Sequence, residues 1–244
     1  MATLDLPPPF RLVTLREAGD AFSHATDVAA REGAGTLVHV GRFDLAEFAL
    51  VLEPDEPLRV ARRAFYAGMV ALADALAAHA PPEKSITFDW PDAIRIDGGL
   101  IGGGRLGGPV GVAENEVPPW IVFGATVRTV AMGEGEPGLR PSGSALDLEG
   151  FEDVDSGRLV ESFARHFMRL IDVWHERGFG EIARDYLARL PPDKDVRRDI
   201  DENGDLLKRA MKGNLVSSGI EHLSLTDALV TVSWFDRATR GPRM

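Results

Sequence analysis

The sequence predicts an α+β fold, and three features of its 244 residues indicate this class. Short runs rich in β-branched and aromatic residues surround an Ala-rich helical segment in the first third of the chain. Strand and turn patterns fill the middle, and two amphipathic helical patterns follow. Hydrophobic residues make up 44% of the chain and charged residues 27%, so a substantial core can form.

The first third is expected to contain three strands and two helices. An Ala-rich segment over residues 18–31 is expected to be a helix that ends at Gly33. A second helix is predicted where large apolar residues recur every three or four positions between Phe65 and Leu76, and it ends before Pro81-Pro82. The predicted strands are Arg11–Leu15, Thr36–Val40 and Ala46–Leu52.

The middle of the chain predicts further strands, and a pair of helices follows it. The Gly/Pro-rich residues 133–143 are expected to form a loop. The first helix of the pair has Ser156 as its predicted N-cap and ends at Gly178, and the second runs from Phe179 to Leu190. The predicted strands are residues 85–90, 93–97, 100–105, 110–113 and 121–130.

Two domains are expected, with the boundary at Pro191-Pro192 and the charged run after it. Residues 1–192 would form the main domain, and residues 193–244 a small β-rich C-terminal appendage. This second part has few large apolar residues and would be marginal alone, so we expect it to dock on the first.

Composition excludes several classes of function. The chain has no cysteine, which rules out disulfides, thiol catalysis and Cys-ligated metal. Its six histidines are scattered without metal-ligand spacing, so no metal site is predicted. The formal net charge of −11 argues against nucleic-acid and membrane-surface partners. No apolar run suits a membrane span or a secretory signal, so a cytoplasmic location is the expectation.

The most distinctive stretch joins an aromatic ring, a carboxylate and glycines across a predicted hairpin. Trp90 and Asp92 lie at the end of one strand, and Gly98-Gly99 turns the chain into the Gly-Gly-Gly-Arg run at residues 102–105. Such groups can line a small-ligand pocket, because glycine lets a ligand approach the backbone. The alternative is a strand that enters a proline turn, with glycines that accommodate a crossing element.

A second candidate feature lies in the long β-prone run 121–130. Because alternate residues share a face, Gly124, Thr126 and Arg128 are expected to point one way and Phe123 the other. Small residues beside a cation are typical of an anion-binding groove. Alternatively, Arg128 lies at an edge of the strand and simply reaches water.

The order of these features resembles that of biotin protein ligases. FDWPDAIRIDGGLIGGGRL (residues 88–106) resembles their lysine-tryptophan-proline-asparagine-aspartate strand with its return strand, and WIVFGATVRTVA (residues 120–131) resembles their glycine-rich strand. Residues 139–148 are similar to their Thr-Ser-Leu segment and residues 158–190 to their closing helix pair. The resemblance covers about residues 10–190, and the tail is similar to a shortened form of their small C-terminal β domain.

The resemblance implies a class II synthetase/biotin ligase-like domain, in which helices back a mixed β-sheet. Members of that family condense biotin or lipoate with ATP to an acyl-adenylate, and then pass the acyl group to a lysine of a carrier domain. It therefore implies ATP with Mg and biotin or lipoate as cofactors only if ligase activity survives. A biotinyl or lipoyl carrier domain is the implied partner, and a homodimer is a further possibility.

A single ligand-binding site is expected from the two candidate features and the family order of strands. Trp90, Asp92, Gly103 and Arg128 should lie around one concavity on neighbouring strands of one sheet. The ligand would be a small acyl, carboxylate or nucleotide-like molecule. The complete predicted set is Trp90, Asp92, Gly102, Gly103, Gly104, Arg105, Gly124, Thr126 and Arg128.

The sequence departs from the family pattern where the chemistry needs charge. Only Gly41-Arg42 remain of a Gly/Arg-rich loop, Leu100 stands at the position of a lysine, and Arg128 stands at that of an asparagine. Groups that stabilise developing transition-state charge are each worth about 2.7–4 kcal/mol. The first hypothesis is therefore a ligase-like protein with a persisting pocket and altered or lost ligase activity. The alternatives are an active ligase that uses relocated arginines, and a non-enzymatic scaffold that docks carrier domains.

Overall fold

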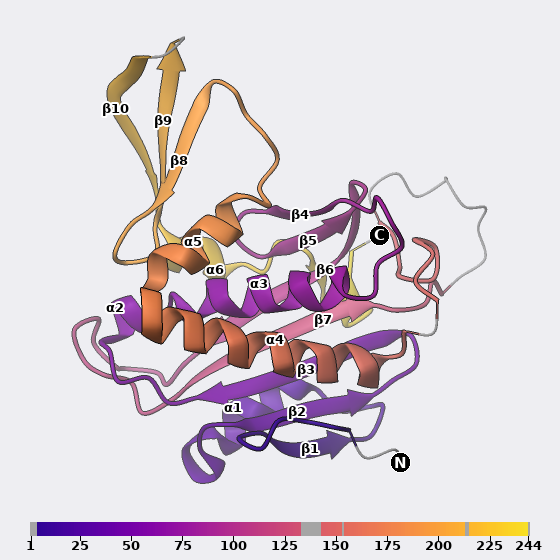
Figure 1. Cartoon of the computed structure of the whole chain (residues 1–244). Helices are drawn as coiled ribbons and strands as arrows, with labels where there is room; N and C mark the ends of the chain where they lie inside the picture. The colour runs from indigo at the N-terminus through magenta and orange to yellow at the C-terminus, as the bar shows by residue number, and fades with distance from the viewer. Residues whose placement is uncertain (1–3, 133–142, 153, 213–214, 244) are drawn as a thin grey trace.

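A computed structural model describes residues 4–132, 143–152, 154–212 and 215–243 of the chain. Its centre is a seven-stranded mixed sheet in the order β1-β2-β3-β7-β6-β5-β4 (Figure 1). β1 and β2 are parallel, and the other neighbouring pairs are antiparallel. The strands are β1 (Arg11–Leu15), β2 (Thr36–Gly41), β3 (Leu45–Leu52), β4 (Ile86–Asp89), β5 (Ala93–Ile96), β6 (Gly99–Gly107) and β7 (Ile121–Arg128).

One face of this sheet is covered by three helices that enclose the main core. They are α3 (Ala64–Ala77), α4 (Ser156–Arg177) and α5 (Phe179–Leu187), and the short α2 (Leu58–Ala61) precedes them. α3 is buried nearly all round, as its almost uninterrupted apolar sequence requires. Phe163 of α4 packs on Phe48 of β3 and on Phe123 of β7, with ring centroids 4.6 and 5.8 Å apart.

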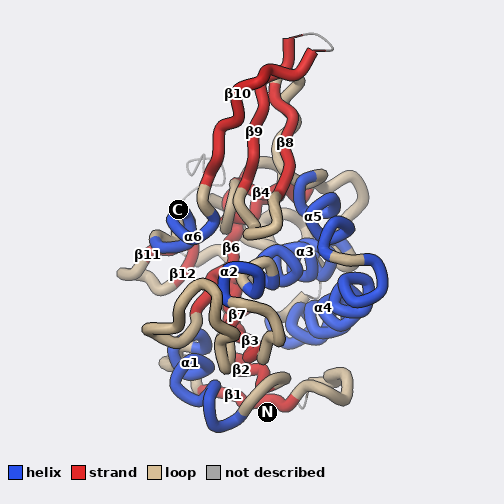
Figure 2. The backbone as a smooth tube through the Cα atoms, turned by 90° about the vertical axis from the view of Figure 1, so that its left-hand side faces the viewer, coloured by secondary structure: helices blue, strands red, loops and turns tan. Residues whose placement is uncertain are grey.

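The other face of the sheet is covered by α1 (Ala21–Glu32) and by the end of the chain. Figure 2 shows α3 and α4 on one side of the sheet and α1, α6, β11 and β12 on the other. α1 packs small side chains, Ala21, Ala25 and Ala29, against β2, β3 and β7. Asp20 caps this helix, because its Oδ1 accepts a hydrogen bond from the Ser23 backbone N–H at 2.8 Å.

The C-terminal part forms a small sheet and then returns to the main one. β8 (Val196–Ile200), β9 (Leu206–Lys212) and β10 (Leu215–Leu223) form an antiparallel sheet that projects from the main body (Figure 1). The Tyr66 hydroxyl donates to the Gly204 carbonyl at 2.6 Å and ties this sheet to α3. The chain then continues through α6 (Leu225–Val230), β11 (Phe235–Asp236) and β12 (Gly241–Pro242), and β12 lies against β6 and β7.

The α+β class and a mixed sheet backed by helices are confirmed, and two local predictions are wrong. Residues 110–113 form a turn at Val110-Gly111 and irregular chain after it instead of a strand, because Gly111 adopts φ +87° and Val110 projects fully into solvent. Asp155, and not Ser156, caps α4, and its Oδ1 accepts from the Arg158 N–H at 2.8 Å. Of the predicted loop 133–143, residues 133–142 lie outside the described residues. Among the described helices, none is long and apolar enough to cross a membrane.

Candidate functional site

The sheet face opposite α3 and α4 carries most of the predicted site residues. β6 pairs with β7 so that Gly103 lies opposite Thr126 and Arg105 opposite Gly124. Val122 packs against α1, whereas Phe123 joins the core under α3 and α4. The predicted alternation along β7 is therefore confirmed.

Trp90 lies on the opposite face, and its predicted place in the concavity is wrong. Its indole Nε1 donates to the Tyr66 hydroxyl at 3.1 Å, and its ring packs on the core under the helices. The physical reason is the alternation of an extended chain, because Phe88 is buried in that core and Trp90 follows it by two residues. Asp92, Gly103 and Arg128 do share the other face, where each lies under the last residues of the chain.

Gly102 and Gly104 of the predicted set do not face the site either. A Cβ added to Gly104 would meet Met69 and Phe65 of α3, so this glycine lets α3 pack closely on β6. A Cβ added to Gly102 would meet the backbone of β7 at Thr126. Both positions therefore have structural reasons to be glycine.

Residues 231–243, called here the C-terminal segment, cover the predicted ligand face. The Ser233 backbone N–H and hydroxyl donate to the Asp92 carboxylate at 2.9 and 2.5 Å. Trp234 is 1% exposed, and its Nε1 donates to the Gly104 carbonyl at 3.1 Å. A Cβ on Gly103 would overlap the Trp234 indole. Gly103 thus accommodates a crossing element, which is the structural alternative raised for this glycine run.

Gly124 is also covered by an aromatic side chain, as Gly103 is by Trp234. Phe22 of α1 lies directly over this glycine, and a Cβ there would overlap the ring. Two glycines on one sheet face are therefore each covered by an aromatic ring of the same chain. The apolar part of the predicted concavity is filled.

A polar centre remains beside these rings. The Arg105 guanidinium carbon lies 4.7 Å from the centroid of the Phe22 ring and 4.7 Å from that of Phe235. Its Nε is buried without a hydrogen-bond partner among the described residues, and the same is true of the Thr126 Oγ1. Burial lowers the pKa of Arg105, and the carboxylates of Asp20 and Glu47 oppose this shift. The two atoms lie on adjacent strands, and no described residue meets their hydrogen-bonding capacity.

Glu47 belongs to this centre although the predicted set does not include it. It lies on β3 opposite Thr126 and is 3% exposed. Its Oε1 accepts from the Ala21 N–H at 2.8 Å, at the start of α1. Burial raises its pKa, and the hydrogen bond from Ala21 opposes the rise. The sequence holds a signal for it, because Glu47 is the single charged residue in the buried strand AEFALVL.

The other cations that a phosphate could use are held by contacts within the chain. Arg42, in the short β2–β3 connection, donates to the Asp44 carboxylate at 3.0 and 2.8 Å. Lys84 pairs with Asp97 and Glu149. At the end of β7, Arg128 donates to the Pro242 carbonyl.

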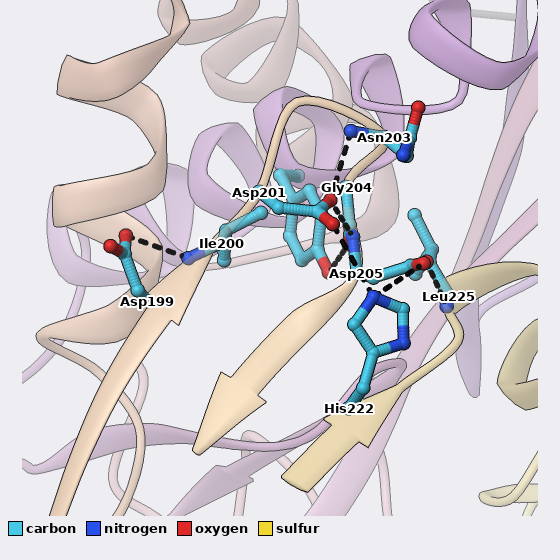
Figure 3. Close-up of polar contacts among 9 residues, drawn as sticks. Asp199, Ile200, Asp201, Asn203, Gly204, Asp205, His222 and Leu225 are labelled. Carbon is cyan, nitrogen blue, oxygen red and sulfur yellow. Dashed lines mark hydrogen bonds and ion pairs between the residues drawn. The ribbon is translucent and has the colours of Figure 1, made fainter. Parts of the chain in front are cut away.

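A second polar cluster lies at the base of the small sheet (Figure 3). His222 Nε2 lies 3.4 Å from Asp201 Oδ2 and 3.3 Å from Asp205 Oδ2, and the three groups are close enough to hold a metal ion. The two carboxylates also hold the backbone. Asp201 Oδ1 accepts from the N–H groups of Asn203 and Asp205, and Asp205 Oδ1 accepts from that of Leu225. This cluster closes the β8–β9 turn and fixes the start of α6.

A groove of about 670 Å³ lies elsewhere in the molecule, between Pro9-Phe10 near the start of the chain and α4. Arg63 is stacked there, 4.8 Å from the ring centroid of Phe179 and 5.5 Å from that of Trp174. No residue of the predicted ligand-binding set lines this groove.

Comparison with known proteins assigns the family. The model of the biotin/lipoate A/B protein ligase family matches residues 6–188. The chain belongs to this family. The predicted resemblance is thereby confirmed, and with it the biotin ligase-like fold. None of the curated proteins matches the chain.

Solved structures of biotin protein ligases share the fold. A biotin protein ligase-like protein of unknown function from a Silicibacter species has a TM-score of 0.77 at 28% identity, over 94% of this chain and 100% of that one. Apo biotin protein ligase from Aquifex aeolicus has a TM-score of 0.65 at 15% identity, over 88% and 96% of the two chains. The Aquifex aeolicus enzyme in complex with biotin and ATP has 0.62 at 13% identity, again over 88% and 96%.

Proposed function

We propose that this member of the biotin/lipoate protein ligase family binds a small carboxylate and does not form acyl-adenylates. The observation that carries the proposal is the unpartnered Nε of Arg105 beside the unpartnered Oγ1 of Thr126. Both atoms are buried on the sheet face that the family resemblance associates with ligand binding. A buried donor without a partner is costly, so a ligand that supplies acceptor oxygens would be stabilised there.

A carboxylate fits the chemistry of these two groups. Guanidinium N–H donors bind carboxylate oxygens in the plane of the guanidinium, and a hydroxyl can donate to the same group. Glu47 is also on this face, so the local charge is balanced and favours a ligand with one negative charge over a polyphosphate. The Aquifex aeolicus relative binds biotin and ATP, which supports a small-molecule ligand.

ATP with Mg does not fit the residues that this face offers. Arg42 forms an ion pair with Asp44, and Lys84 forms ion pairs with Asp97 and Glu149. Leu100, at the position of the family's lysine, is buried against Trp234. Of the described cations named here, Arg105 alone has a buried donor without a partner, so transition-state charge on a phosphate would lack the other preorganised cations, and this lack supports the loss of ligase chemistry.

Pyrophosphate exchange tests the catalytic half of the proposal. The protein, ATP and Mg are incubated with biotin, lipoate or octanoate, with Aquifex aeolicus biotin protein ligase as the positive control for biotin. The expected result is exchange no greater than in a blank without protein. Robust exchange with any of the three acids would instead establish an active ligase that uses relocated arginines.

Equilibrium dialysis with labelled propionate tests the binding half. The wild-type protein should bind, and Arg105→Gln should weaken binding at least tenfold because the charged donor is lost. Arg165→Gln, on the exposed surface of α4, is the matched control and should bind as the wild type does. If propionate does not bind, or if Arg105→Gln binds equally well, the carboxylate proposal fails. The scaffold hypothesis then takes its place, to be tested by capture of a lipoyl or biotinyl domain.

A further inference from the structure

The geometry points to Trp234 and Phe22 as the residues that select the ligand of the proposed carboxylate site. We infer that these rings restrict the site to carboxylates with short carbon chains and exclude acyl chains as long as octanoate. This inference rests on the proposed function, because it concerns the same polar centre at Arg105.

Two aromatic rings restrict the directions from which a ligand can reach Arg105. The centroids of Phe22 and Phe235 each lie 4.7 Å from the guanidinium carbon. Arg105 as a residue is partly buried, and its Nε has no hydrogen-bond partner among the described residues. A carboxylate must therefore approach in the guanidinium plane, with its oxygens toward Nε and Thr126.

The carbon chain of such a ligand would have to run along the sheet beside the carboxylate. Gly103 and Gly124, which flank Thr126 and Arg105 across the β6–β7 pair, are the positions where an acyl chain could lie on bare backbone. Trp234 occupies the space over Gly103, and Phe22 occupies that over Gly124. A chain of a few carbons avoids both rings, whereas a longer chain collides with one of them.

The position of Trp234 is fixed by several contacts of the C-terminal segment. Ser233 donates two hydrogen bonds to Asp92, and the indole N–H donates to the Gly104 carbonyl. Arg240 donates to the carbonyls of Ala18 and Gly19 at 3.1 and 2.5 Å. These contacts hold the indole over Gly103, so its size sets the limit on the ligand.

The test compares propionate and octanoate binding by equilibrium dialysis in the wild type and in Trp234→Gly. Wild-type protein should bind propionate and bind octanoate at least tenfold more weakly. Trp234→Gly should improve octanoate binding at least tenfold relative to propionate binding, so that the preference for the short chain is lost. Trp174→Gly, which removes an indole next to Phe179 on the other side of the sheet, is the matched control and should not improve octanoate binding.

A second variant covers the case that Trp234→Gly does not fold, which circular dichroism would reveal. Phe22→Leu shortens the side chain over Gly124 and should also improve octanoate binding. Wild-type protein that binds octanoate as tightly as propionate would overturn the inference and leave the carboxylate site intact. A folded variant that gains nothing for octanoate would overturn it as well. Failure of every protein to bind propionate would instead overturn the proposed function.

Discussion

Glu47 and Asp92 are buried carboxylates on the covered face of the main sheet, 3% and 1% exposed. Burial raises the pKa of both groups, although each accepts hydrogen bonds that oppose the rise, from Ala21 and Ser233. In the pH range between the ordinary pKa and the raised one, the folded protein binds more protons than the unfolded chain. Their contribution to stability is therefore largest at low pH and falls as the pH rises through the raised pKa.

Replacing Glu47 by Gln should remove part of this pH dependence. The amide oxygen can still accept from the Ala21 N–H, and the buried charge is gone. Relative to wild type, Glu47→Gln should gain stability at pH 8, and the gain should shrink as the pH falls through the raised pKa of Glu47. Urea unfolding at pH 8 and at acidic pH measures the free energy of unfolding of both proteins. Glu176→Gln, at an exposed position, is the control. A variant less stable than wild type at pH 8 would show that the Glu47 charge is favourable where it lies.

At the level of single residues, the sequence predicts which face of the sheet a side chain occupies. It is a poorer guide to which distant segment of the chain packs over that face. The alternation that separates Thr126 from Phe123 is a local property of an extended chain, so it was predictable. The contact of Ser233 with Asp92 joins residues 141 positions apart, and no local pattern encodes it. Glycines at 103 and 124 indicated a close approach, but not that the chain's own aromatic rings make it.

At the level of elements, α3 packs closely on the sheet. Gly68 lies against the Phe123 ring, and a Cβ at this position would overlap the ring atoms. The periodicity of large residues predicted this helix, but it did not reveal that the small residues are buried as well. Strand periodicity likewise located β1 to β7, because buried strands carry β-branched and aromatic residues. It failed at residues 110–113, where Gly111 takes a left-handed φ.

Gly68→Ala should destabilise the protein by about 1–3 kcal/mol, because an added methyl group overpacks a filled core. Gly180→Ala in α5 is the matched substitution, since no atom lies within 4 Å of a Cβ placed there. It should be neutral or stabilising by up to about 1 kcal/mol, as alanine is the better helix former. Denaturant unfolding of both variants measures the contrast. Equal effects would show that α3 can move away from Phe123.

At the level of the whole molecule, the C-terminal segment connects parts of the chain that are distant in sequence. It contacts β6 and β7 through β12 and the start of α1 through Arg240. The predicted boundary at Pro191-Pro192 falls between α5 and β8, and a docked β-rich tail was expected there. The return of residues 231–243 across the main sheet was not predictable, because one Trp-Phe pair in a polar tail does not specify its partner.

A chain that ends after Val230 should therefore be less stable than the full chain. It lacks Trp234, and removal of a buried aromatic side chain costs about 3–5 kcal/mol. For a protein of this size each kcal/mol lowers the Tm by about 2–4 °C, so a decrease of about 6–20 °C is expected. Calorimetry of the two chains measures it, and Val230→Ala, whose side chain is exposed, should leave the Tm unchanged. An unchanged Tm in the shortened chain would mean that the main sheet does not need this cover. In that case the Ser233–Asp92 and Trp234–Gly104 hydrogen bonds would serve only to close the ligand face.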